Sequence, residues 1–460
     1  MKHFPKYLML ALTMFSVVAC NIKKEEVVTS NLNRLTTPKV EKVTDKYNNQ
    51  MSQTTYKSYT AFTKKFAKLA IETTNKEKEE SLGVSIPDAY LCLAISAVIS
   101  DDEARNDVLS YLELNSVDEL RTSVKEVLAT LCTLRKNYEG QLQGGYNLNS
   151  IWLDPQQVKL VEEKDEQMYK DLEEVFDAST YMEALTSKKA NSYLDENGLK
   201  DLPTPKIQLD DENPPAMGVM SVYYCLDYFD EGMKNYYKNQ YTSGTHKMDY
   251  IYGENTAKVD YIEQIRYGEV YVGDGFHGAD LGISSLSMSY FLPDNKSVMP
   301  SAILSDVLDG EYAAKVGKCT DYKGNEEETT IHDIDISAPY FSLNNEISLN
   351  HEVLKTILPK ITNRGAGARL AETIDPDGYT YLDFIKQFSV MKFNYDGFYS
   401  CSVTIGGYGA NTSIGPTYEK YELKLDHPYI FQVQKGVSVN SMSYKLPIVI
   451  GEIVNPDYQD

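Results

Sequence analysis

The 460-residue sequence predicts an α+β fold with helices mainly in its first half and large mixed or antiparallel sheets in its second. Apolar residues recur at helical spacing early in the chain, as in Phe62, Phe66 and Leu69. From Met217 the run MGVMSVYYCLDYF is apolar on both faces, which is typical of a central strand. Neither a repeat nor a second linker interrupts residues 51–460, so we expect one domain there.

The first twenty residues have the features of a secretory signal. A basic start, MKHFPK, precedes the apolar run YLMLALTMFSVV, which is too short for a comfortable membrane span. Residues 17–20, VVAC, are similar to the bacterial lipobox, whose cysteine is lipidated and becomes the first residue. We therefore expect a lipoprotein signal peptide at 1–20 and attachment to the lipid bilayer through Cys20. The alternative is an ordinary signal peptide with an incidental cysteine.

Residues 21–50 are polar and lack periodicity, so we interpret them as a flexible tether between the lipid and the domain. The expected location is the cell surface or outer membrane, as a secreted and membrane-anchored lipoprotein. Residue 21 is Asn rather than Asp, which in enteric-type bacteria favours the outer membrane.

The helices of the first half follow in order. SIPDAYLCLAISAVIS is apolar nearly all round, which predicts a buried helix, and EARNDVLSYL follows it. Ser116 and Glu119 form a capping-box pattern ahead of LRTSVKEVLATLCTL. YNLNSIWL then alternates as a strand, and DEQMYKDLEEVF returns to helical spacing.

The second half reads mainly as strands. Alternating or apolar runs that follow Met217 are KMDYIYG, VDYIEQIRYGEVYV, LSMSYFL, DISAPYFSL, KFNYD, YELKL, YIFQVQ and MSYKLPIVIGEIV.

Charge and composition exclude several functions. A formal net charge of −22 makes a nucleic-acid partner improbable, because phosphate binding needs clustered Lys and Arg. The sequence has no HExxH motif, no GxSxG nucleophile elbow and no CxxC pair, so it gives no support for an enzyme, and we expect no cofactor or metal. The five cysteines after the signal show no metal-ligand spacing; they are Cys92, Cys132, Cys225, Cys319 and Cys401.

Two motifs imitate ligand sites. Residues 273–278 match GxGxxG, but a strand pattern follows where a dinucleotide site needs a helix, so we expect a hairpin turn. Residues 375–378, DPDG, lack the acidic register of a calcium loop, and we expect a turn.

The order of these elements resembles the serpin family over roughly residues 55–456. PYIF at 428–431 is similar to the strand that follows the serpin reactive loop, and LPIVIGEIVNP at 446–456 is similar to the closing strand. Other segments match family motifs in position and character: NSIW at 149–152, NSYL at 191–194, LSMSYFLPDNK from 286 and IDISAPYFSLNNEI from 334.

The resemblance implies a reactive loop after Gly397, which stands where serpins carry the hinge glycine. In that family a serine or cysteine protease attacks the loop, and the cut loop inserts as a new strand into the large sheet and distorts the acyl-enzyme. Insertion needs small residues at the alternate positions that turn inward, which Ser400, Ser402 and Thr404 provide. Phe398 departs from the family pattern; it is expected to overpack the sheet by roughly 1–3 kcal/mol and to slow insertion.

Two reactive bonds remain open. The fourteenth residue after Gly397 gives Asn411–Thr412, which we prefer because the insertion length is set from the hinge. Counting back from Pro428 gives a bond near Thr417–Tyr418.

The resemblance implies a monomeric, surface-anchored suicide inhibitor of serine or cysteine endopeptidases. The alternatives are a non-inhibitory serpin-fold module that binds another surface partner, which the bulky Phe398 and Tyr399 favour, and an unrelated mixed α/β surface protein.

Overall fold

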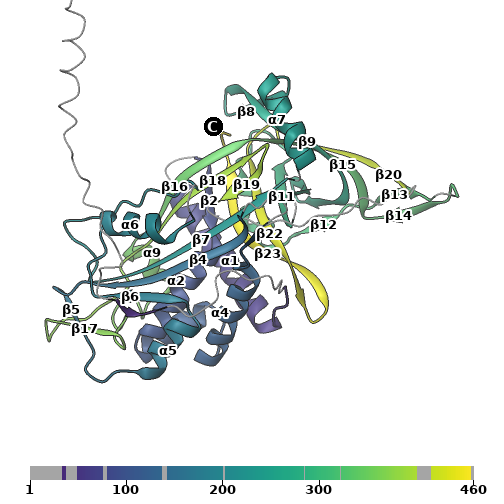
Figure 1. Ribbon diagram of the computed structural model, residues 1–460. Coiled ribbons are helices and arrows are strands. Elements are labelled where there is room, and N and C mark those ends of the chain that lie inside the picture. Colours follow the sequence, from purple (N-terminus) through teal and green to yellow (C-terminus); the bar gives the residue numbers. More distant parts are fainter. Residues whose placement is uncertain are drawn as a thin grey trace, which may run out of the picture.

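A computed structural model describes residues 34–37, 49–75, 80–136, 142–199, 202–229, 231–283, 285–321, 323–400 and 416–456. The described residues form an α+β fold in which helices pack on both faces of a large twisted sheet (Figure 1). The predicted signal peptide, with Cys20, lies outside the described residues.

The structure describes nine helices, of which six lie in the first half of the chain, as expected. They are α1 (Gln53–Asn75), α2 (Ile86–Ile99), α3 (Asp102–Tyr111), α4 (Val117–Leu131), α5 (Glu166–Glu174), α6 (Ser187–Asn197), α7 (Glu231–Ser243), α8 (Leu304–Asp309) and α9 (His351–Ile357). Helix α2 is almost entirely buried. At the start of α4 the Ser116 hydroxyl accepts the Glu119 N–H at 3.2 Å, as the predicted capping box requires. The Glu119 carboxylate accepts the backbone N–H of Asn115 at 2.8 Å, which is one residue before the N-cap Ser116.

The first large sheet has eight strands. Their order is β1 (Arg34–Thr36), β6 (Ala178–Tyr181), β4 (Leu142–Leu153), β7 (Met217–Tyr228), β19 (Gly397–Ser400), β18 (Ile385–Asn394) and β16 (Phe341–Leu349), with β3 (Arg135–Lys136) paired to β4. Helix α6 covers one face, and α1, α2 and α4 lie under the other (Figure 1). The run from Met217 is therefore a central strand, as predicted.

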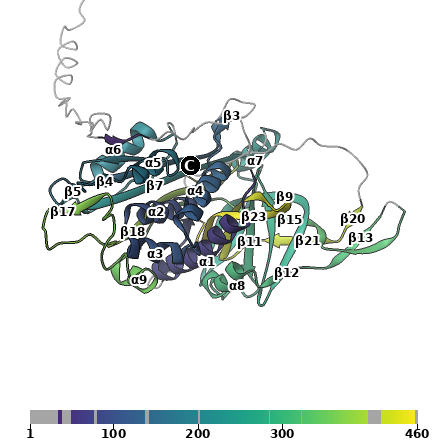
Figure 2. The same cartoon turned by 90° about the horizontal axis from the view of Figure 1, so that it is seen from below.

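The second large sheet has ten strands. Their order is β2 (Leu82–Ser85), β23 (Met442–Ile453), β22 (Tyr429–Val439), β11 (Leu286–Pro293), β10 (Phe276–Gly282), β9 (Asn255–Gly273), β15 (Ile331–Pro339) and β21 (Lys420–Lys424), while β8 (Lys247–Tyr252) and β12 (Tyr312–Ala314) also pair with β9. Two small sheets complete the fold: β14 (Glu326–Thr329), β13 (Gly317–Thr320) and β20 (Thr417–Tyr418) in one, β17 (Ala371–Thr373) and β5 (Val158–Leu160) in the other. The β13–β14 hairpin projects from the body beside β20 (Figure 2).

Two predicted turns are present. The GxGxxG match is the hairpin between β9 and β10, with Gly275 at φ 76°, and Gly378 closes a turn by donating its N–H to the Asp375 carbonyl at 3.0 Å. Both motifs therefore form chain turns, as the sequence predicts.

Two features differ from the sequence prediction. Arg34–Thr36 lies inside the expected tether, yet it pairs with β6, and the Thr36 hydroxyl donates to the Ala178 carbonyl at 2.8 Å, so this part of residues 21–50 is fixed to the domain. Helix α7 was missed because Tyr237 is its single buried residue, which leaves almost no apolar stripe to detect. In the described part of the chain, no helix is long and apolar enough to cross a membrane.

Candidate reactive loop and strand-accepting cleft

The segment after the predicted hinge glycine is already a strand of the eight-stranded sheet. β19 lies between β7 and β18 and is antiparallel to both. Gly397 stands opposite Tyr228 and Asn394, and Ser400 stands opposite Cys225 and Met391. The first four residues of the predicted loop are therefore inserted at one end of the sheet.

Gly397 is required by the local backbone. Its φ of 140° is a conformation that residues with a side chain rarely adopt. An added Cβ would lie 2.2 Å from the Asp227 carbonyl oxygen of β7. The turn before it is fixed, because the Asp396 carbonyl accepts the Phe229 N–H at 2.9 Å and its carboxylate lies 3.0 Å from the Lys234 ammonium.

The hinge side chains alternate between two environments. Phe398 and Ser400 point inward and are 1% and 2% exposed, and Phe398 belongs to the main hydrophobic core. Tyr399 points to the other face, where its hydroxyl donates to the Pro203 carbonyl in the segment after α6. The Phe398 ring therefore already lies in the core at this end of the sheet while, in the described chain, the rest of β7 and β18 remains unpaired by a central strand.

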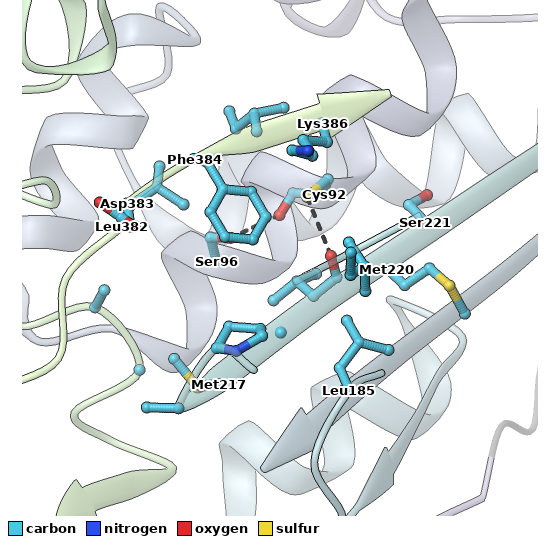
Figure 3. A pocket seen from close by; sticks show the side chains of 18 of the residues that line it. Cys92, Ser96, Leu185, Met217, Met220, Ser221, Leu382, Asp383, Phe384 and Lys386 are labelled. Atoms are coloured by element: carbon cyan, nitrogen blue, oxygen red, sulfur yellow. Dashed lines mark hydrogen bonds between the residues drawn. The ribbon is translucent and has the colours of Figure 1, made fainter. Parts of the chain in front are cut away.

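Below β19 the sheet is open. In the described chain no strand pairs with the inner edges of residues 217–224 in β7 or 385–390 in β18. The gap leads into a cavity of ≈ 1010 Å³ that is floored by α2 and bordered by both strands. Figure 3 shows Met220 and Ser221 on β7, Lys386 on β18, and Cys92 and Ser96 on the helix beneath. We call this opening the cleft.

A buried carboxylate sits where the cleft meets the start of α2. Asp88 accepts hydrogen bonds from the Ser85 hydroxyl and from the Gln387 amide, the latter at 3.1 Å. Burial raises the pKa of Asp88 to about 6, against the lowering effect of these hydrogen bonds. The Gln387 amide also exchanges bonds with the Ser85 backbone, donating to its carbonyl at 2.7 Å and accepting its N–H at 2.9 Å. This cluster ties β18 to α2.

Sequence reasoning missed the Asp88 cluster. The available signal was one acidic residue inside the otherwise apolar helix SIPDAYLCLAISAVIS. A buried charge needs hydrogen-bond partners, and Asp88 could have been identified on that ground. Its partner Gln387 is 299 positions away in the chain, so the pairing itself was not visible.

Cys92 contributes a half-buried thiol to the lining of the cleft. Burial raises its pKa to about 12, and its Sγ lies 3.8 Å from the Val219 carbonyl of β7. The four described cysteines are thiols and not disulfides, and no cluster of His, Cys, Asp and Glu among the described residues is suited to a metal ion.

The far end of the predicted loop is a strand as well. In β20, Thr417 stands opposite Thr320 and Tyr418 opposite Cys319 of β13. β21 then continues parallel to β15. Ser402, Thr404, Asn411 and Thr412 lie outside the described residues, so the structure places the hinge and the C-terminal end of the loop but not the preferred bond.

Comparison with known proteins defines the fold. The thermophilic serpin tengpin in its native state superposes with a TM-score of 0.63 at 14% identity, over 92% of this chain and 100% of tengpin. Arabidopsis AtSerpin1, in a native stressed conformation, gives 0.59 at 16% identity over 87% and 98%. Human thyroxine-binding globulin complexed with thyroxine gives 0.58 at 12% identity over 88% and 100%.

No protein-family model and no curated protein matches the sequence. The chain nevertheless has the serpin fold, which confirms the predicted architecture. At these identities the likeness concerns the fold alone. Since thyroxine-binding globulin and AtSerpin1 share it, the function has to be argued from the cleft and the hinge.

Proposed function

We propose that this protein is a suicide inhibitor of serine or cysteine endopeptidases and not an enzyme. The observation that carries the proposal is the hinge: four residues form a strand between β7 and β18, directly above an unpaired cleft. A cut loop that continued this strand would satisfy the backbone groups on both open edges.

The two registers of β19 predict how insertion proceeds. Extended residue by residue, they place Ser402 between Tyr223 and Ser389, and Thr404 between Ser221 and Gln387. These loop residues then face the floor of the cleft, as Phe398 and Ser400 already do. Small side chains at these positions suit the space between the strands and α2.

For the scissile bond we retain Asn411–Thr412. Strand pairing of Thr417 and Tyr418 supports this choice, because a protease needs the residues around the bond as a free extended segment. Mass spectrometry of the cleaved chain tests it: fragments that meet at Thr417–Tyr418 would reverse the assignment.

The test of inhibition is covalent trapping. Protein lacking residues 1–20 is mixed with trypsin-like, chymotrypsin-like, elastase-like and papain-like proteases and resolved on a denaturing gel. A stable band at the summed mass supports the proposal. In Thr404→Arg the band is expected to be lost while cleavage continues, because the side chain would have to enter the cleft. Ser413→Arg, beyond the preferred bond, is the matched control and is expected to keep the band.

A second candidate function is a non-inhibitory binding module. Its support is the fixed hinge, with Phe398 in the core and Tyr399 bonded to Pro203. Clean cleavage of the wild-type loop by every protease, without a stable band, would favour it.

We also propose that the chain is a lipoprotein held at the cell surface or outer membrane through Cys20. Its support is VVAC at the end of an apolar run. Cys20→Ala is expected to leave the protein unprocessed or soluble. Membrane fractionation of this variant at the mature size would refute the anchor.

A further inference from the structure

One face of the ten-stranded sheet exposes large apolar side chains. Ile265 and Tyr267 of β9 are 69% and 63% exposed, the highest values among the large hydrophobic residues that the structure describes. They are two positions apart on one strand and therefore share a face. Isolated exposed apolar residues are common, but here two neighbours on one face of a strand lie among acidic side chains.

Carboxylates surround these two residues. The β9–β15 register places Asp335 opposite Ile265 and Asp333 opposite Tyr267. On the next strand, the β15–β21 register places Glu422 opposite Asp335 and Lys420 opposite Asp333. We call this surface the acidic face; its residues are Ile265, Tyr267, Asp333, Asp335, Lys420 and Glu422.

The acidic face carries three carboxylates and one ammonium group, that of Lys420, which acts against the raising of the Asp335 pKa by its acidic neighbours. Burial, followed by the charges of Glu263, Glu422 and Asp333, raises the pKa of Asp335. Within the described residues, the salt bridges do not include Asp333, Asp335 or Glu422. A cationic group from another molecule would relieve this repulsion.

The acidic face adjoins the end of the predicted loop. The Tyr418 ring lies 5.1 Å from the Tyr267 ring, and β21 begins at Lys420. Asn411 precedes Lys420 by nine positions, a span on the order of 30 Å at full extension. β9, β15 and β21 lie side by side on the flank where β20 and β13 project (Figure 2). A protease engaged at the loop therefore lies within reach of this face.

We propose that the acidic face is a docking surface for the attacking protease, and that it selects proteases with basic and apolar residues beside their active site. The inference rests on the proposed attack at the loop. A second copy of this chain is disfavoured as the occupant, because a symmetric contact would set the same carboxylates against each other in a chain of net charge −22.

The test measures the rate at which the intact loop is consumed, counting trapped and cleaved products together. The probe is whichever protease of the panel consumes the wild-type loop fastest. Glu422→Lys and Tyr267→Ser are expected to slow consumption by about three- to tenfold, and the effect of Glu422→Lys is expected to shrink at high salt. The controls are Glu103→Lys on α3 and Tyr236→Ser on α7, both of which change exposed residues off this face. A synthetic peptide of residues 404–420 contains none of the four substituted positions, so the protease should cleave it at the same rate in every assay series, which controls for protease activity.

The outcomes separate the two proposals. Slower consumption with release of an active protease would support the acidic face and refute inhibition. Normal consumption in both variants, with trapping intact, would overturn the docking surface alone. Wild-type dimerisation in sedimentation that Tyr267→Ser abolishes would assign the face to a second copy and overturn the protease as its occupant. A loop that no protease of the panel attacks would overturn both proposals.

Discussion

Cutting the loop should stabilise the protein, because the cleft offers two unpaired strand edges. The perturbation is a single nick within residues 407–415 by a protease that is then inactivated. If residues 401–406 continue β19, their N–H and C=O groups form about twelve new backbone hydrogen bonds with β7 and β18. Each contributes about 0.5–1.5 kcal/mol net, and the low end is appropriate because ordering six residues offsets part of the gain.

These values give about 6 kcal/mol of added stability. For a chain of this length, 1 kcal/mol corresponds to roughly 1–2 °C in Tm, so the nicked protein should melt at least about 6 °C above the intact protein. Differential scanning calorimetry of intact and nicked samples measures the shift. Nicked Thr404→Arg is expected to show little or no gain, while nicked Ser413→Arg should match wild type. A nicked wild type that melts at or below the intact protein would show that the cleft does not accept the loop.

Three further predictions concern the hinge and the buried carboxylate. Gly397→Ala should destabilise the intact protein by about 1–3 kcal/mol in urea unfolding, because its Cβ would lie 2.2 Å from a backbone carbonyl oxygen. Gly253 is also at positive φ but an added Cβ there would have nothing within 4 Å, so Gly253→Ala should lower the free energy of unfolding by less. Phe398→Ala should cost about 3–5 kcal/mol as a core truncation, and Tyr399→Phe only about 0.5–1.5 kcal/mol; similar losses for both would contradict the burial difference. Asp88 has a folded-state pKa raised to about 6 from 3.8, so the folded state binds the proton more tightly, and the contribution of Asp88 to stability should rise by about 2 kcal/mol as the pH falls from 7 to 4. That gain should be absent from Asp88→Asn, and an unchanged pH slope in this variant would refute the assignment.

The sequence was most informative where local patterns coincide with tertiary structure. The apolar run from Met217 predicted the central strand β7, because a strand covered by helices on both faces has no polar side. Ser116 predicted the start of α4 because capping is a local interaction between residues a few positions apart. The glycine hairpin at 273–278 was recognised because a strand rather than a helix follows it.

The sequence was least informative about the hinge. Alternation correctly placed Ser400 and Phe398 on the inward side, but the size of Phe398 alone does not reveal whether the space it enters is already built. That space depends on Phe393 and Asp227, which come from two different strands. The acidic face could not be predicted for the same reason, because its residues come from three strands that are far apart in the chain.

The position of Phe398 changes which step of loop insertion is expected to be slow. From the sequence, a phenyl ring had to pass the end of the sheet first and would raise the barrier. In the structure the ring is already in the core, and the register places Ser402 next among the inward residues, between Tyr223 and Ser389. The Tyr223 hydroxyl is occupied, donating to the Leu131 carbonyl at 3.0 Å.

A small serine therefore meets the unpaired edges of β7 and β18. Truncating Phe398 would remove a core side chain from β19, the strand that lies between β7 and β18. Enlarging Ser402 would instead obstruct the cleft that the loop has to enter. We accordingly expect substitutions at Ser402 to change the ratio of trapped to released protease, and substitutions at Phe398 to change the stability of the intact chain.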